Sequence, residues 1–136
     1  MWIRYIGISF LHWIGWQMVQ AAILLYVRNY IVIQGDALML TMWASAFIVS
    51  FPFAVFAFHV RAPGAKAVLQ YGGMHLAVSV LMLFVVGYAL FPGLDLLIFS
   101  QEMWGQWSVE VLGIIAAAWY VRRRIRSVQG AEGLSA

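Results

Sequence analysis

The sequence predicts an all-α integral membrane protein: a four-transmembrane-helix bundle with short loops and both termini in the cytoplasm. Three observations lead to this fold class: an apolar composition, four apolar segments of membrane-spanning length, and cations gathered on alternate loops. Of the 136 residues, 65% are hydrophobic and 10% are charged, and the mean hydropathy is +0.90. A soluble domain carries about 25% charged residues. Because so little polar surface is available, lipid must cover most of the folded chain.

Composition also excludes several classes of site. The chain contains no Cys, which rules out disulfides, thiolate metal sites, iron–sulfur ligation and Cys nucleophiles. The net charge of +3 is too small to indicate nucleic-acid binding. The apolar run that follows Arg4 is too long for the core of a signal peptide, and no small-residue cleavage site follows it. We therefore expect this run to be retained as a membrane helix.

The first two spans are expected on either side of a short turn. The first is predicted at residues 5–27, between Arg4 and Arg28. A membrane-spanning helix needs about 20 residues, so this segment is long enough. The second is predicted at residues 37–60 and contains Pro52, which removes one backbone hydrogen bond and can bend a helix.

The third span is predicted at residues 67–91 and the fourth at residues 94–121. A Pro-Gly pair precedes each of them, as expected where one helix stops and the next begins. Residues 1–126 are therefore expected to form one transmembrane domain. The short polar tail at residues 127–136 is expected to be disordered.

The cations predict the orientation. Four spans place both termini and the middle turn on one side of the membrane. Arg28 is then the single Lys or Arg residue on the opposite side. Cytoplasmic loops carry an excess of Lys and Arg, so the cation-rich side is predicted to be cytoplasmic. We expect a multi-pass protein of a bacterial-type inner membrane. The seven cations on the predicted cytoplasmic side are Arg4, Arg61, Lys66, Arg122, Arg123, Arg124 and Arg126.

The fourth predicted helix carries polar groups where a membrane helix normally has none. A charged side chain at the bilayer centre costs roughly 3 kcal/mol on insertion scales. At 100° per residue, the polar and small residues of this helix fall on one face, and Trp104, Val111 and Ile115 fall on the other. The polar face is therefore expected to contact protein, because small residues allow close helix packing. It consists of Glu102, Gln106, Glu110, Gly113 and Ala117.

The first and third helices also carry polar stripes. His12 and His75 are expected at nearly equal depths, roughly 12 and 14 Å from the cytoplasmic end, with Glu110 a turn deeper at roughly 18 Å. We therefore predict an intramembrane polar cluster that consists of Glu110, Gln106, Glu102, Gln17, Gln20 and His12. No catalytic residues and no metal ligands are predicted.

The two histidines suggest one cofactor. Two imidazoles at equal depth on neighbouring helices can supply both axial ligands of a b-type haem. The hypothesis is that His12 and His75 bind haem b in an electron-transfer subunit or a quinone-interacting membrane anchor. No other cofactor is suggested by the sequence.

Three functions remain open. The preferred hypothesis is a non-catalytic accessory or scaffold subunit, which uses its polar and small-residue faces to bind other membrane-protein subunits or a second copy of itself. The first alternative is the haem subunit. The second is a small oligomeric transporter or channel that is coupled to protons or cations through Glu110. We do not expect an enzyme, because no HExxH motif, His-box cluster or Gly-rich phosphate loop is present.

Overall fold

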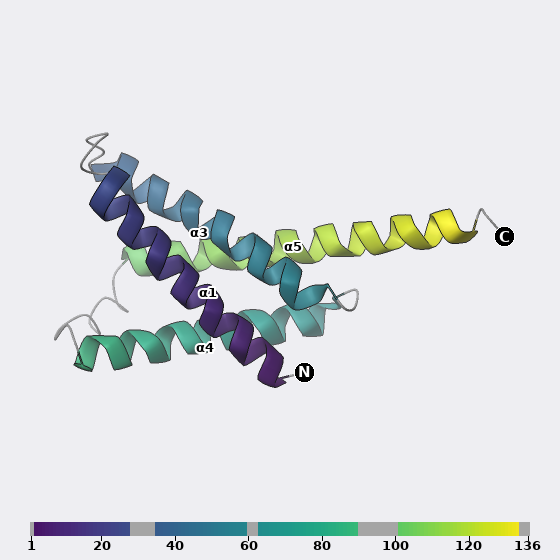
Figure 1. Cartoon of the computed structure of the whole chain (residues 1–136), viewed down its shortest axis with the longest axis horizontal. Helices are drawn as coiled ribbons and strands as arrows, with labels where there is room; N and C mark the ends of the chain where they lie inside the picture. The colour runs from purple at the N-terminus through teal and green to yellow at the C-terminus, as the bar shows by residue number, and fades with distance from the viewer. Residues whose placement is uncertain (1, 28–34, 60–62, 90–100, 134–136) are drawn as a thin grey trace.

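The computed structural model describes residues 2–27, 35–59, 63–89 and 101–133, and within these ranges it contains helices and no strand. Figure 1 shows the helices in chain order. They are α1 (Trp2–Ala22), which continues as the π-helical turn η1 (Ile23–Val27), α3 (Gly35–Phe58), α4 (Ala65–Ala89) and α5 (Gln101–Gly133). The all-helical class predicted from the sequence is thus confirmed.

Three of these helices are long and apolar enough to cross a membrane. They are the segments Trp2–Tyr26, Gly35–Phe58 and Ala65–Val86, which correspond to the first three predicted spans. The predicted fourth span differs from them, because α5 has 33 residues and includes a charged second half. Its predicted beginning, residues 94–100, lies outside the described residues.

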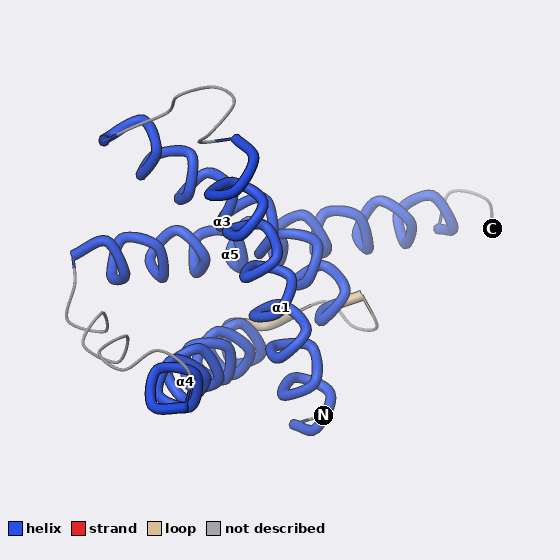
Figure 2. The backbone as a smooth tube through the Cα atoms, turned by 60° about the vertical axis from the view of Figure 1, so that its left-hand side comes forward, coloured by secondary structure: helices blue, strands red, loops and turns tan. Residues whose placement is uncertain are grey.

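α5 continues past the predicted end of the fourth span to Gly133, so it includes residues 127–133 of the polar tail. Adding a residue to an existing helix is far easier than starting a new one. In Figures 1 and 2 the C-terminal half of α5 projects beyond the other helices.

α3 and α5 form the most extensive helix pair, and α1 packs against α4 and α3. Glycine makes the first of these contacts possible. A Cβ atom at Gly113 would lie 2.9 Å from the Ser50 Cβ atom and 3.1 Å from the Phe47 carbonyl oxygen. Both distances are too short for a comfortable contact, so α5 approaches α3 this closely only because position 113 lacks a side chain. Gly113 is buried, as its place on the polar face predicted.

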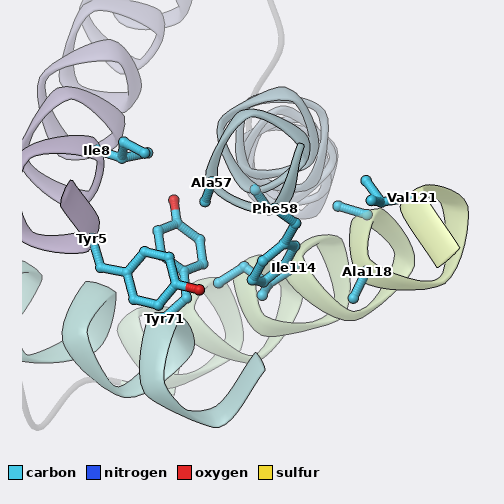
Figure 3. Close-up of a cluster of buried hydrophobic side chains, with 10 residues drawn as sticks. Tyr5, Ile8, Ala57, Phe58, Tyr71, Ile114, Ala118 and Val121 are labelled. Atoms are coloured by element: carbon cyan, nitrogen blue, oxygen red, sulfur yellow. The ribbon is translucent and has the colours of Figure 1, made fainter. Parts of the chain in front are cut away.

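All four helices share one apolar core. Figure 3 shows side chains from each of them meeting near the N-terminal end of α1. The rings of Tyr5, Phe58 and Tyr71 contact one another edge to face, with centroid separations of 5.5–6.5 Å. Ile114, Ala118 and Val121 add the contribution of α5. This aromatic group holds α1, α3 and α4 together at one end of the molecule.

Two arginine side chains connect helices at the same end of the molecule through hydrogen bonds to backbone carbonyl oxygens. The Arg4 guanidinium donates a 2.7 Å hydrogen bond to the Phe56 carbonyl oxygen and lies 2.8 Å from Nδ1 of His59. The Arg122 side chain donates to the carbonyl oxygen of Pro63. The beginning of α1, the end of α3, the beginning of α4 and the middle of α5 therefore lie together.

Candidate functional site

A buried carboxylate pairs with a buried imidazole between α4 and α5. Nε2 of His75 lies 2.9 Å from Oε2 of Glu110. The second carboxyl oxygen, Oε1, accepts a 2.9 Å hydrogen bond from the amide of Gln106, which lies one helical turn earlier on α5. The exposed fractions of His75 and Glu110 are only 1% and 2%. Both oxygens of the buried Glu110 carboxyl group therefore have partners within the chain.

This pair can hold one proton in two ways. With the proton on nitrogen, an imidazolium faces a carboxylate, and with the proton on oxygen, a carboxylic acid faces a neutral imidazole. Each arrangement keeps the hydrogen bond, because either heavy atom can donate and the other accept. Movement of the proton between His75 and Glu110 leaves the net charge of the pair unchanged.

The ring of His12 stacks on one face of the His75 ring. The two imidazoles are stacked with their centroids 3.9 Å apart and their planes 10° from parallel. Phe53 covers the other face of His12, with a centroid separation of 5.3 Å and an interplanar angle of 11°. α1, α3 and α4 thus each contribute one ring to a continuous stack that ends at Glu110 on α5.

Several buried polar atoms around this stack have no hydrogen-bond partner among the described protein groups. A buried polar group without a partner costs about 1–3 kcal/mol, so native structures contain few of them. Where such atoms cluster, either ordered water provides the missing hydrogen bonds or the groups take part in the function of the protein. They are Oγ of Ser9, both ring nitrogens of His12, Nε1 of Trp16, the Tyr71 hydroxyl and Nδ1 of His75.

A cavity of about 80 Å³ lies between α1, α4 and α5, with His75 and Glu110 in its wall. One water molecule needs about 10–15 Å³, so this cavity has room for several. Across it, the amides of Gln20 and Gln106 approach to 3.5 Å. The remaining walls are formed by Trp13, Trp16, Gln17, Ser79, Leu83, Val86, Met103 and Trp107. The His75–Glu110 pair therefore borders a cavity that has both polar and apolar walls and is large enough for several water molecules.

The structure brings together four residues of the predicted polar cluster, which are Glu110, Gln106, Gln20 and His12. Gln17 also lines the cavity, although its side chain is exposed. Glu102 is exposed and does not line the cavity.

Sequence reasoning did not identify the direct partner of Glu110. The sequence predicts His75 only as a possible haem ligand, although its position on the polar stripe of the third helix is a signal that it faces the other helices. Trp107 also lines the site, but an apolar residue in an apolar helix gives no signal of this kind.

The arrangement of the two histidines does not favour haem. Axial ligands to one iron approach it from opposite sides, each with a ring nitrogen directed at the metal. Here the rings of His12 and His75 face each other at 3.9 Å, which leaves no space for a macrocycle between them. Nε2 of His75 is also occupied by Glu110. In the described parts of the chain, no group of three or more His, Asp or Glu could hold a metal ion.

No protein-family model, curated protein or solved structure matches this chain. Function must therefore be inferred from the geometry of the site.

The pairing predicts a specific pattern of stability. His75→Leu leaves the Glu110 carboxyl group buried without its main partner and should destabilise the fold by about 3–5 kcal/mol. The double variant His75→Leu/Glu110→Leu removes both polar groups and should recover most of that loss. Thermal unfolding in detergent, followed by circular dichroism, measures both effects.

Glu102→Leu is the matched control, because it removes the exposed carboxylate of the same helix and should change the midpoint little. If the double variant were as unstable as the sum of its two single variants, the pair would contribute no coupling, and this interpretation would be wrong.

Proposed function

We propose that the chain is a four-span membrane protein that conducts protons, or couples proton movement to transport, through the His75–Glu110 pair. The observation that supports this function best is the position of the pair, which is fully buried and borders the cavity between α1, α4 and α5. Ionisable groups at membrane depth commonly mark ion or proton pathways.

α5 is proposed as the fourth span. The part of α5 from Gln101 to Val121 has 21 residues, or about 31 Å of helix, which matches the hydrocarbon thickness of a bilayer. Its polar side chains Gln106 and Glu110 face the other helices, whereas Trp104 and Ile115 are exposed. The polar groups that reduce its mean hydropathy are thus the ones kept away from lipid.

The contacts at the cationic end support the proposed orientation. Arg4 bonds to the end of α3, and Arg122 bonds to the turn before α4, so two of the cations predicted to share one side lie at the same end of the described structure. By the positive-inside rule, this end and both termini are proposed to be cytoplasmic in a bacterial-type inner membrane.

Proton handling follows from the chemistry of the site. The pair would take up one proton from water in the adjoining cavity and return it there, past the amides of Gln20 and Gln106, and each uptake raises the charge of the pair by one.

An accessory subunit is the second candidate, and one observation favours it. Gln17 on α1 is exposed although it lies well inside the apolar segment Trp2–Tyr26. An amide at this position gains a hydrogen bond if another membrane helix covers it. The buried groups of the site, by contrast, already contact one another within the chain and are unavailable to a partner.

The topology can be tested by single-cysteine labelling, since the chain has no native Cys. Asp36→Cys and Ser127→Cys each place a thiol at an exposed position. Asp36 lies in the first turn of α3, and Ser127 follows the proposed fourth span. In intact cells, a membrane-impermeant maleimide should label Asp36→Cys, and Ser127→Cys should react only after permeabilisation. Labelling of both positions in intact cells would show that α5 does not cross the membrane.

The proposed activity can be tested in proteoliposomes that contain a pH-sensitive dye and carry a proton gradient with a potassium–valinomycin potential. The wild-type protein should dissipate the gradient, and Glu110→Gln should slow the flux at least tenfold because its side chain cannot bind a proton. Glu102→Gln makes the same chemical change at an exposed position of α5 and should retain the wild-type rate.

Two outcomes would contradict the proposal. Equal flux through the wild type and Glu110→Gln would remove the pair from the pathway. A wild-type protein that is folded but passes no protons would leave the accessory subunit as the better interpretation.

A further inference from the structure

We propose that the groove between the end of α3 and the charged half of α5 binds one anionic phospholipid, with the lipid phosphate at Arg124. The groove has a volume of about 380 Å³ and is separate from the His75–Glu110 site. Figure 1 shows α5 running past the end of α3 at this place. Its walls are formed by Val55, His59, Tyr120, Val121, Arg124, Ile125 and Val128.

The four arginines of α5 differ in what they contact. Arg122 donates to the Pro63 carbonyl oxygen, and the guanidinium of Arg123 lies 3.9 Å from the centre of the Trp119 ring. Arg124 and Arg126 are both exposed, but only Arg124 lines the groove. Two arginines are thus engaged within the chain, and Arg124 is the one placed to bind a ligand in the groove.

Charge complementarity indicates an anionic occupant. The carboxylates whose side chains the structure describes are Asp36, Glu102 and Glu110, and none of these three lines the groove. Asp36 lies in the first turn of α3, at the far end of that helix from His59, and Glu102 lies about 33 Å along α5 from Arg124. No carboxylate whose side chain the structure describes therefore neutralises Arg124, and phosphate oxygens match the hydrogen-bond donors of a guanidinium.

The imidazole of His59 is held at the same groove by the chain itself. Arg4 approaches Nδ1 of His59 at 2.8 Å, and the ring stacks on Phe56 with a centroid separation of 5.2 Å. A fixed imidazole opposite Arg124 gives the groove a second polar group from a different helix, which an exposed run of arginines would not provide.

The apolar walls indicate a lipid rather than free phosphate. Val55, Val121, Ile125 and Val128 provide an aliphatic surface that inorganic phosphate would leave uncovered, whereas an acyl chain would bury it. Tyr120 lies beside them with its ring against Phe51, in the position that amphipathic aromatic residues take at a membrane interface. A phospholipid satisfies both the cationic and the apolar parts of the groove.

Native mass spectrometry of the purified protein can test this assignment. The protein is released from mixed micelles that contain equal amounts of phosphatidylglycerol and phosphatidylcholine with identical acyl chains. The wild type should retain one phosphatidylglycerol per chain in clear preference to phosphatidylcholine. Arg124→Gln should reduce that retention about tenfold, as expected for loss of one charge-assisted hydrogen-bonded contact.

Arg126→Gln is the matched control, since it removes the same charge two residues away without altering the groove, and it should retain the lipid as the wild type does. Arg124→Lys should restore part of the binding, and circular dichroism should show wild-type helicity for each variant. Equal losses in Arg124→Gln and Arg126→Gln would indicate only diffuse attraction to the basic helix and would overturn the proposal. Absence of a preference for phosphatidylglycerol, or its displacement by an equal concentration of inorganic phosphate, would also overturn it.

Discussion

The hydrogen bond between His75 and Glu110 is the interaction on which the arrangement of the bundle depends. α4 and α5 share few other contacts, because α5 packs mainly against α3 and α4 mainly against α1. A buried carboxyl group without a partner would cost several kcal/mol, and this cost opposes any separation of the two helices. The pair therefore links α4 directly to α5, in addition to the contacts between α1 and α3 that also join the two halves of the molecule.

The same constraint extends to the other helices through ring stacking. His75 carries His12 on its face, and His12 in turn carries Phe53, so α4, α1 and α3 are fixed relative to one another. Gly15 makes the last contact possible, because a Cβ atom there would lie 3.1 Å from the Phe53 ring. Small residues at Gly15 and Gly113 thus allow the close helix packing that brings the polar groups into one cluster.

Helical periodicity predicted much of this site. The 100° rule placed Gln106, Glu110 and Gly113 on one face of the fourth helix, and all three are buried. Glu102 shares that face by angle but is exposed, because it lies in the first turn of α5, where the bundle does not enclose it. Periodicity gives the direction of a side chain from its helix axis, but not whether a neighbour lies there.

The partner of Glu110 could not be predicted from the sequence. Depth estimates placed Glu110 about one turn deeper than His75, and only the tilt and axial shift of the packed helices bring these side chains together. The equal depth of His12 and His75 suggested haem ligands, but equal depth also permits stacking. The orientation of the rings distinguishes the two arrangements, and it depends on packing that a single sequence does not encode locally.

A distance measurement in a lipid bilayer tests the central interaction most directly. Magic-angle-spinning NMR on protein labelled with ¹³C at the Glu carboxyl carbons and ¹⁵N in the His rings detects carbon–nitrogen pairs at short range. We predict a separation of about 4 Å between Cδ of Glu110 and Nε2 of His75, from the 2.9 Å hydrogen bond and the carboxyl bond. The signal should vanish in His75→Gln and persist in His59→Gln. Its absence from the wild-type protein, or its survival in His75→Gln, would contradict the pairing.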